Sequence, residues 1–414
     1  MAYASTAFGQ LRYIPETVPG VTPTVGTGLN LRTTNPTAKA QVESIKSNEI
    51  NSTRMVKSST NVDMNVDGGF DFELSAGEYD PFLAGVLCGT WSHYGTDGLG
   101  DPVSLVTTAT TITAAAAPAG NSAFTNLGLS TWFKLIPPAA ASASVKAYFN
   151  DLWLKTHETT PSTATVLTLS PLTPLSGVGL MAVSTAGFKI SSSTVVNGQA
   201  KPSFTLEWDQ TDIGQFLHYK GMRPNTMSLE FAVGSIITGS FGFMGQGHDI
   251  TQASVLPKDG GNWVASKDGE VMNSVTDVGI IAVGGVNLLA GGTSFIRNIS
   301  LEINNNLRGQ KAVGVFGNAG VGYGEFAVSG SMEVYFQDET LYKQALEGTN
   351  TTLAFGVADF TGAGYLIELD KIRFNNASMN PGGKDGDMMV SLPIEAFYRT
   401  DLQRGIRITR ARSA

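Results

Sequence analysis

Cysteine and histidine are scarce in this chain of 414 residues, which restricts its covalent and metal chemistry. The one cysteine, Cys88, cannot form a disulfide within the chain and stands beside Leu87 in an apolar segment, so we expect a buried structural thiol. The four histidines are His93, His157, His218 and His248. None has an acid or a cysteine at metal-ligand spacing. The sequence therefore predicts no metal site and no cofactor.

Charged residues are also few, at 15% of the chain, and basic ones fewer still. The net charge is −8, whereas binding of nucleic acid through its phosphates needs clustered lysine and arginine. The one basic run covers residues 404–412, where arginines alternate with isoleucine and threonine. This alternation favours an edge strand protected by its charges over a nucleic-acid contact.

Long apolar runs and catalytic motifs are missing as well. No stretch approaches 18 apolar residues, and the N-terminal segment lacks the pattern of a signal peptide, so we expect no membrane contact and a protein that stays in a cytoplasm or leaves it only as part of something else. The glycines between Gly314 and Gly324 precede a strand instead of linking a strand to a helix, which is the wrong context for a dinucleotide loop. We therefore expect a protein that is not an enzyme.

Glycine, serine, threonine and valine are abundant. Glycine supplies 48 residues, roughly 12% of the chain against a usual share of about 7%. In one predicted strand, Phe70, Phe72 and Leu74 alternate with Asp71 and Glu73, which is typical of a strand with one buried face and one polar face. The composition predicts a mainly β protein with many turns.

A short motif occurs twice and indicates a duplicated unit. Ser47-Asn48-Glu49-Ile50-Asn51 returns as Ser300-Leu301-Glu302-Ile303-Asn304. A glycine-led strand follows each copy, and after it comes a short helix signal. We expect an aspartate to open and cap each helix, Asp80 in the first copy and Asp338 in the second. We therefore predict two tandem β-sandwich modules, each with a short flanking helix.

The two modules are not contiguous, because residues 97–197 differ in composition. This segment is rich in alanine and threonine, has almost no acids before Asp151, and contains short β runs at 130–136 and 164–169. We predict an inserted β-rich decoration domain at 97–197, a first module at 1–96 and 198–258 with an extended arm at 1–40, and a second module at 259–414.

Several segments of the second module resemble a known family. They are the repeated motif at 300–304, the glycine loop to Gly324, Gly330-Ser-Met-Glu-Val-Tyr-Phe336, the helix segment 338–346, and 388–396. The chain resembles the tail tube (major tail) proteins of long, non-contractile-tailed bacteriophages, in a form with a duplicated module. The likeness is weaker over the first module, and the insert lies outside it.

The resemblance implies a structural protein of the virion tail. Its copies would form rings that stack into a tube, and genome DNA would pass through an acidic bore. A duplicated chain would give trimeric rings with six module positions, and partners would include the tape measure, tail terminator and distal tail proteins. Two other classes remain open from the residues: a bacterial surface or carbohydrate-binding β-sandwich protein, and a β-rich hydrolase.

Strand alternation and loop length give two sets of candidate residues. The acids that alternate with apolar positions are candidates to line the channel: Asp71, Glu73, Glu207, Asp209, Glu230 and Glu333. Carboxylates there would repel phosphates and keep DNA from sticking. The N-terminal arm and the long loops 53–65 and 305–323 are candidates for the contacts between stacked rings. Their named residues are Arg54, Lys57, Arg308, Lys311 and Phe316.

Overall fold

The computed structural model describes residues 5–412, with gaps at 54, 151, 174, 176–181, 290–294, 338, 382–383 and 385. Strands make up most of its regular structure, so the predicted mainly β class is confirmed. Within the described residues, no helix has the length and apolar character needed to cross a bilayer.

The first module combines elements from both sides of the insert. Its elements are η1 (Thr6–Phe8), β1 (Gly9–Glu16), β2 (Leu29–Leu31), β3 (Asn35–Pro36), β4 (Lys39–Lys46), β5 (Ser59–Glu73), α1 (Asp80–Val86), β6 (Ser92–His93), β13 (Ser193–Val196), β14 (Ser203–Gln210), β15 (Gln215–Ala232), β16 (Thr238–Met244) and β17 (Gly247–Thr251). An outer sheet contains β1, β14, the first half of β15 and β17. An inner sheet contains the second half of β15, then β16 and β5. The long strand β15 therefore belongs to both sheets.

The second module repeats this pattern of pairing. Its elements are β18 (Val278–Val283), β19 (Val286–Asn287), β20 (Ile296–Asn304), β21 (Arg308–Gln310), β22 (Gly320–Gly322), β23 (Ala327–Tyr335), α3 (Thr340–Leu346), β24 (Thr351–Ala358), β25 (Gly364–Phe374), β26 (Ser378–Asn380), β27 (Met389–Ala396) and β28 (Ile406–Ala411). In the outer sheet, the pairs β18–β24, β24–β25 and β25–β28 correspond to β1–β14, β14–β15 and β15–β17 of the first module. In the inner sheet, the pairs β26–β27 and β27–β23 correspond to β15–β16 and β16–β5. This is the topology expected of a duplicated unit.

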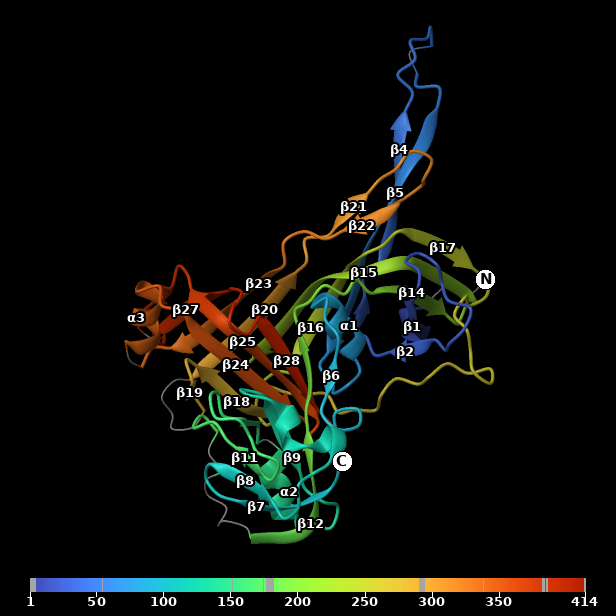
Figure 1. Cartoon of the computed structure of the whole chain (residues 1–414). Coiled ribbons are helices and arrows are strands. Elements are labelled where there is room, and N and C mark those ends of the chain that lie inside the picture. Colours follow the sequence, from blue (N-terminus) through green and yellow to red (C-terminus); the bar gives the residue numbers. More distant parts are fainter. Residues whose placement is uncertain are drawn as a thin grey trace.

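The inner sheets of the two modules join within the chain. Residues 226–232 of β15 pair with residues 298–304 of β20 in antiparallel register. One sheet therefore runs through both modules in the order β5, β16, β15, β20, β23, β27 and β26, with β3 beside the outer edge of β5 (Figure 1). Its apolar side packs on the outer sheets in a core that the two modules share.

The predicted apolar positions of the first module lie in this core. Phe70, Phe72 and Leu74 are buried, and the ring of Phe72 stacks on Phe241 with centroids 5.0 Å apart. The predicted buried thiol is also confirmed, since Cys88 is buried at the end of α1. The strand alternation read from the sequence therefore identified the inward face correctly.

Helix α1 begins at the predicted aspartate, but that residue does not cap it. Pro81 occupies the first turn, where its missing amide costs nothing. The carboxylate of Asp80 instead accepts a hydrogen bond from the Tyr365 hydroxyl at 2.6 Å and pairs with Arg410. The expected capping role is wrong, because tertiary partners from the second module take up this carboxylate. Asp338, the expected counterpart at α3, lies outside the described residues.

The insert folds around a core of its own and rests on the second module. Its elements are β7 (Val103–Thr107), β8 (Thr111–Ala114), η2 (Gly120–Ser122), η3 (Phe124–Leu127), β9 (Trp132–Ile136), α2 (Ala143–Asn150), β10 (Leu154–Lys155), β11 (Val166–Thr168) and β12 (Ala182–Ser191). Trp132 and Trp153 pack on the outer sheet against small side chains such as Ala354. A Cβ at Gly356 would lie 2.9 Å from the Trp153 ring nitrogen, so glycine there admits the indole.

Both chain ends contain strands that lie within sheets, so the expected edge strand is wrong. Strand β28, within the basic run, lies between β25 and β13 and is not an edge strand. Its Arg407 is buried, because it pairs with Glu368 and does not protect an open edge. The expected extended arm at 1–40 contains β1, which pairs along its whole length with β14 in the outer sheet.

The two long segments assigned to loops contain strands. β5 begins at Ser59, inside the segment 53–65, and pairs with β4 to form a long hairpin. The segment 305–323 contains the two-stranded hairpin β21–β22. Figure 1 shows both hairpins projecting from the same side of the molecule, opposite the insert.

Candidate channel face and contact surfaces

The inner sheet presents a polar face in which residues of successive strands lie opposite one another. One row across the strands contains Asp71, Ser240, Ser228, Glu302, Ser329 and Glu395. The next row contains Glu73, Thr238, Glu230, Ser300, Ser331 and Pro393. A third contains Asn298, Glu333, Ser391 and Ser378. Directly opposed residues point to the same side of a sheet, so these acids share one surface across both modules.

This polar face consists mainly of hydroxyls and carboxylates. Serines bridge neighbouring strands, with Ser228 and Ser240 oxygens 2.7 Å apart and those of Ser300 and Ser331 2.8 Å apart. Arg297 lies 3.6 Å from the Glu333 carboxylate and offsets one of the acidic charges. The face is therefore hydrated and acidic, a combination that repels an anionic polymer.

Four of the six predicted channel residues lie on this polar face: Asp71, Glu73, Glu230 and Glu333. The structure adds Glu302 and Glu395, both exposed, which sequence reasoning missed. The alternation of Ser300, Glu302 and Asn304 opposite Leu301 and Ile303 would have identified Glu302. That signal lay within the repeated motif itself.

The remaining two predicted channel residues are buried. Glu207 and Asp209 lie on β14 of the outer sheet, with Arg12 Nη1 2.6 Å from Asp209 and 3.7 Å from Glu207. Burial raises the pKa of Glu207, but the His218 ring, whose Nδ1 lies 3.2 Å from the carboxylate, and hydrogen bonds from Ser254 and the Val255 amide outweigh it and hold that pKa below its usual value. Neither carboxylate is on the surface of the chain, so we remove both from the channel set.

The cover over these acids explains why sequence alternation misassigned them. Trp263, in the segment after β17, lies over the Arg12 guanidinium at 3.6 Å. Ser254 and the Val255 amide donate hydrogen bonds to Glu207. A connecting segment therefore closes over a strand face that looks solvent-exposed in the sequence.

The two projecting hairpins, β4–β5 and β21–β22, form one unit. We call this unit the arm; it is not the extended arm expected at 1–40. Lys311 Nζ lies 2.7 Å from the Asp63 carboxylate and 2.9 Å from the Asn65 amide oxygen, and it lowers the pKa of Asp63. Of the predicted stacking residues, Lys57, Arg308, Lys311 and Phe316 lie on the arm, whereas Arg54 lies outside the described residues. Exposed apolar side chains of the arm are Val42, Ile45, Ile50, Met55, Val56, Val62, Val313, Val315 and Phe316. A two-stranded ribbon is marginally stable in water, and an apolar surface of this kind marks an interaction site.

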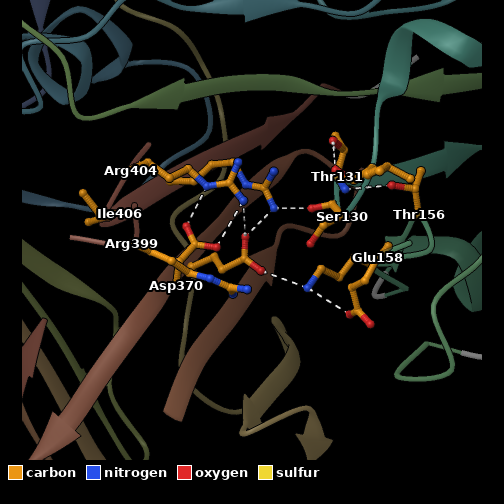
Figure 2. Close-up of polar contacts among 12 residues, drawn as sticks. Ser130, Thr131, Thr156, Glu158, Asp370, Arg399, Arg404 and Ile406 are labelled. Carbon is orange, nitrogen blue, oxygen red and sulfur yellow. Dashed lines mark hydrogen bonds and ion pairs between the residues drawn. The ribbon is translucent and has the colours of Figure 1, made fainter. Parts of the chain in front are cut away.

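A buried ion cluster joins the insert to the second module. Glu368 of β25 pairs with Arg407 of β28 and with Lys155 of the insert, whose Nζ lies 3.1 Å from the carboxylate. Burial raises the pKa of Glu368, but Arg407 and Lys155 lower it to about 2. Figure 2 shows the adjoining pair Arg404 and Asp370, whose Nε and Oδ2 atoms lie 2.6 Å apart. The insert and the second module are therefore linked by buried ion pairs.

Comparison with known proteins gives one family. A search of curated proteins found no match. The family model for phage tail tube proteins matches residues 7–396, which is nearly the whole chain. This match agrees with the duplicated β-sandwich and with the acidic polar face that runs through both modules. The chain belongs to the phage tail tube protein family and is a structural component of the virion tail.

Proposed function

We propose that three copies of this chain close into a ring, and that stacked rings form a tube through which genome DNA passes. The observation that carries the proposal is the junction between β15 of the first module and β20 of the second. Repeating this junction between chains would place β26, the counterpart of the end of β15, at the β3 edge of the next copy. Three chains then supply six equivalent module positions.

The resulting inner barrel is wide enough to hold an aqueous channel. Each chain contributes the seven strands of the joined inner sheet together with β3, which gives 24 strands in a ring of three. At about 4.8 Å per strand, the backbone ring would be about 37 Å across before any tilt. Barrels of 16 to 18 strands already leave a water-filled channel.

The polar face would line this barrel, because the opposite face of the inner sheet is occupied by the core. Asp71, Glu73, Glu230, Glu302, Glu333 and Glu395 would then repeat around and along the channel. Phosphates would meet hydroxyls and carboxylates, so DNA would slide without binding. The insert rests on the outer sheet and would point away from the channel.

The arm would make the contacts between stacked rings. Its apolar side chains project beyond the sandwich and would be covered by the ring above. At the tube ends, the same surfaces would meet other tail proteins, namely the tape measure, tail terminator and distal tail proteins. Assembly would take place in the host cytoplasm.

A charge-reversal experiment tests the channel assignment. Replacing Asp71, Glu73 and Glu333 together by lysine should permit tube assembly but slow genome ejection, with the defect easing at high salt as screening grows. A matched control replaces three exposed acids of the segment between β17 and β18 by lysine, which changes the net charge equally. These acids are Asp259, Asp268 and Glu270. Equal ejection rates for the two variants would show that the polar face does not line the channel.

A further inference from the structure

The two flanking helices occupy corresponding positions but very different environments. Five residues of α1 are buried: Asp80, Phe82, Leu83, Gly85 and Val86. No residue of α3 is buried, and Leu346 in its last turn is 67% exposed. A short helix with an uncovered apolar residue needs an explanation, because its counterpart is part of the core.

The second module provides the cover over α1. At the start of the helix, Asp80 is held by Tyr365 of β25 and Arg410 of β28. At its end, the Asn305 side-chain amide donates a hydrogen bond of 2.8 Å to the Val86 carbonyl. Between them, Leu83 lines a small apolar cavity together with residues of β25 and β28. Helix α1 therefore lies between the modules: Phe82 packs on aromatic rings of the first module, while Asp80 and Leu83 meet the second.

Helix α3 packs on its own module. Leu341, Tyr342 and Ala345 contact the core, as Phe82 does from α1. In the part of the chain that the structure describes, its other side stays uncovered and Leu346 is exposed. Figure 1 shows α3 at one end of the molecule, beside β27, and β17 at the opposite end, beside β14.

The first module carries the surface that corresponds to the cover of α1. Strands β15 and β17 pair as β25 and β28 do. In this pair Leu217 lies opposite Ile250, and Ile250 is 56% exposed. In the second module, Ile367 of β25 lies opposite Ile408 of β28, and both are buried beside Leu83 of α1. An apolar helix face and an apolar receiving surface thus lie at opposite ends of one chain.

We infer that α3 of one copy packs on β15 and β17 of the next copy, with Leu346 against Ile250. This inference rests on the proposed ring and names the surfaces that close it. Such a contact is heterologous, because different patches meet, and heterologous contacts close into rings when the rotation allows. The β26 edge and the α3 face lie on the same module, so strand pairing and helix packing form one interface, as they do between the modules.

Introducing one charge on each side of the proposed contact, singly and together, tests it. Leu346→Lys and Ile250→Glu each place an unpaired charge in an apolar interface, so each should reduce the assembled species from three chains to single chains of 43.6 kDa, measured by native mass spectrometry. The double variant brings opposite charges together and should restore the ring. Leu129→Lys, at an exposed site on the insert, is the control. Both interface residues are exposed in the single chain, so thermal unfolding of the variants should match the wild type.

The outcomes separate this inference from the ring itself. Loss of rings in the single variants with recovery in the double variant supports the contact. Single variants that assemble like the wild type overturn it, as does a double variant that stays monomeric. A wild-type tube whose rings contain six full-length chains would instead overturn the proposed trimer.

Discussion

Glu368 provides a direct test of the energetic link between the insert and the second module. Glu368→Gln keeps the shape of the side chain but removes the charge that Arg407 and Lys155 face. These two cations lower the pKa of the buried carboxyl from an ordinary 4.5 to about 2. At about 1.4 kcal/mol for each pKa unit, the charged form contributes roughly 3 kcal/mol to the free energy of unfolding. This agrees with the roughly 3–5 kcal/mol lost when one partner of a buried ion pair is removed.

The same shift predicts a pH dependence with a defined sign. Because the folded pKa lies below the unfolded one, the contribution is complete above about pH 4.5 and is lost as the pH falls toward 2. The glutamine variant lacks this dependence. The difference between wild type and Glu368→Gln should therefore be about 3 kcal/mol at pH 7 and shrink steadily between pH 4.5 and pH 2.

Urea unfolding followed by tryptophan fluorescence measures this difference, since Trp132 and Trp153 lie at the interface. Glu302→Gln, at an exposed position of the polar face, is the control and should change the unfolding free energy by less than about 0.5 kcal/mol at either pH. A Glu368→Gln effect below about 1 kcal/mol at pH 7, or one that persists unchanged near pH 2, would refute the reasoning.

Three further predictions address the module junction, the arm and the insert. Asp80→Asn leaves Arg410 without its carboxylate and should cost about 3 kcal/mol in urea unfolding. Asp401→Asn, at an exposed pair with Arg399, is the control and should leave the unfolding midpoint nearly unchanged; equal effects would contradict the structure. Replacing residues 309–321 by a short linker should yield soluble single rings in negative-stain images, and tubes of normal length would exclude the arm as the stacking contact. Deleting residues 100–190 should lower the melting temperature, because it uncovers the face of Ala354 and Leu366, yet still permit tubes; a folded deletion variant without rings would place the insert in the ring contact.

Much of the fold was predictable from local pattern. Alternation along β5 and β23 identified the buried and polar sides, because successive side chains of a strand point in opposite directions regardless of context. The repeated motif led to the prediction of a duplication, but its two copies do not correspond in the structure: 300–304 lie in β20 with Ile303 buried, whereas 47–51 connect β4 to β5 with Ile50 exposed. The change in composition after residue 97 marked the insert. The module boundaries remain predictions, whereas the duplication is seen in the repeated order of strand pairing.

What lies over each strand face was decided only by tertiary structure. Glu207 and Glu230 have the same alternating surroundings in the sequence, yet Glu207 is buried under the segment after β17 and Glu230 is exposed. Arg407, which the sequence placed on an edge, pairs with a carboxylate buried beneath the insert. The physical reason is that periodicity fixes which side chains share a face, while partners distant in sequence decide whether that face meets water or protein. The sequence by itself therefore determined the β class, the order of elements and the sides of each strand, and only the tertiary structure decided which acids remain on the surface.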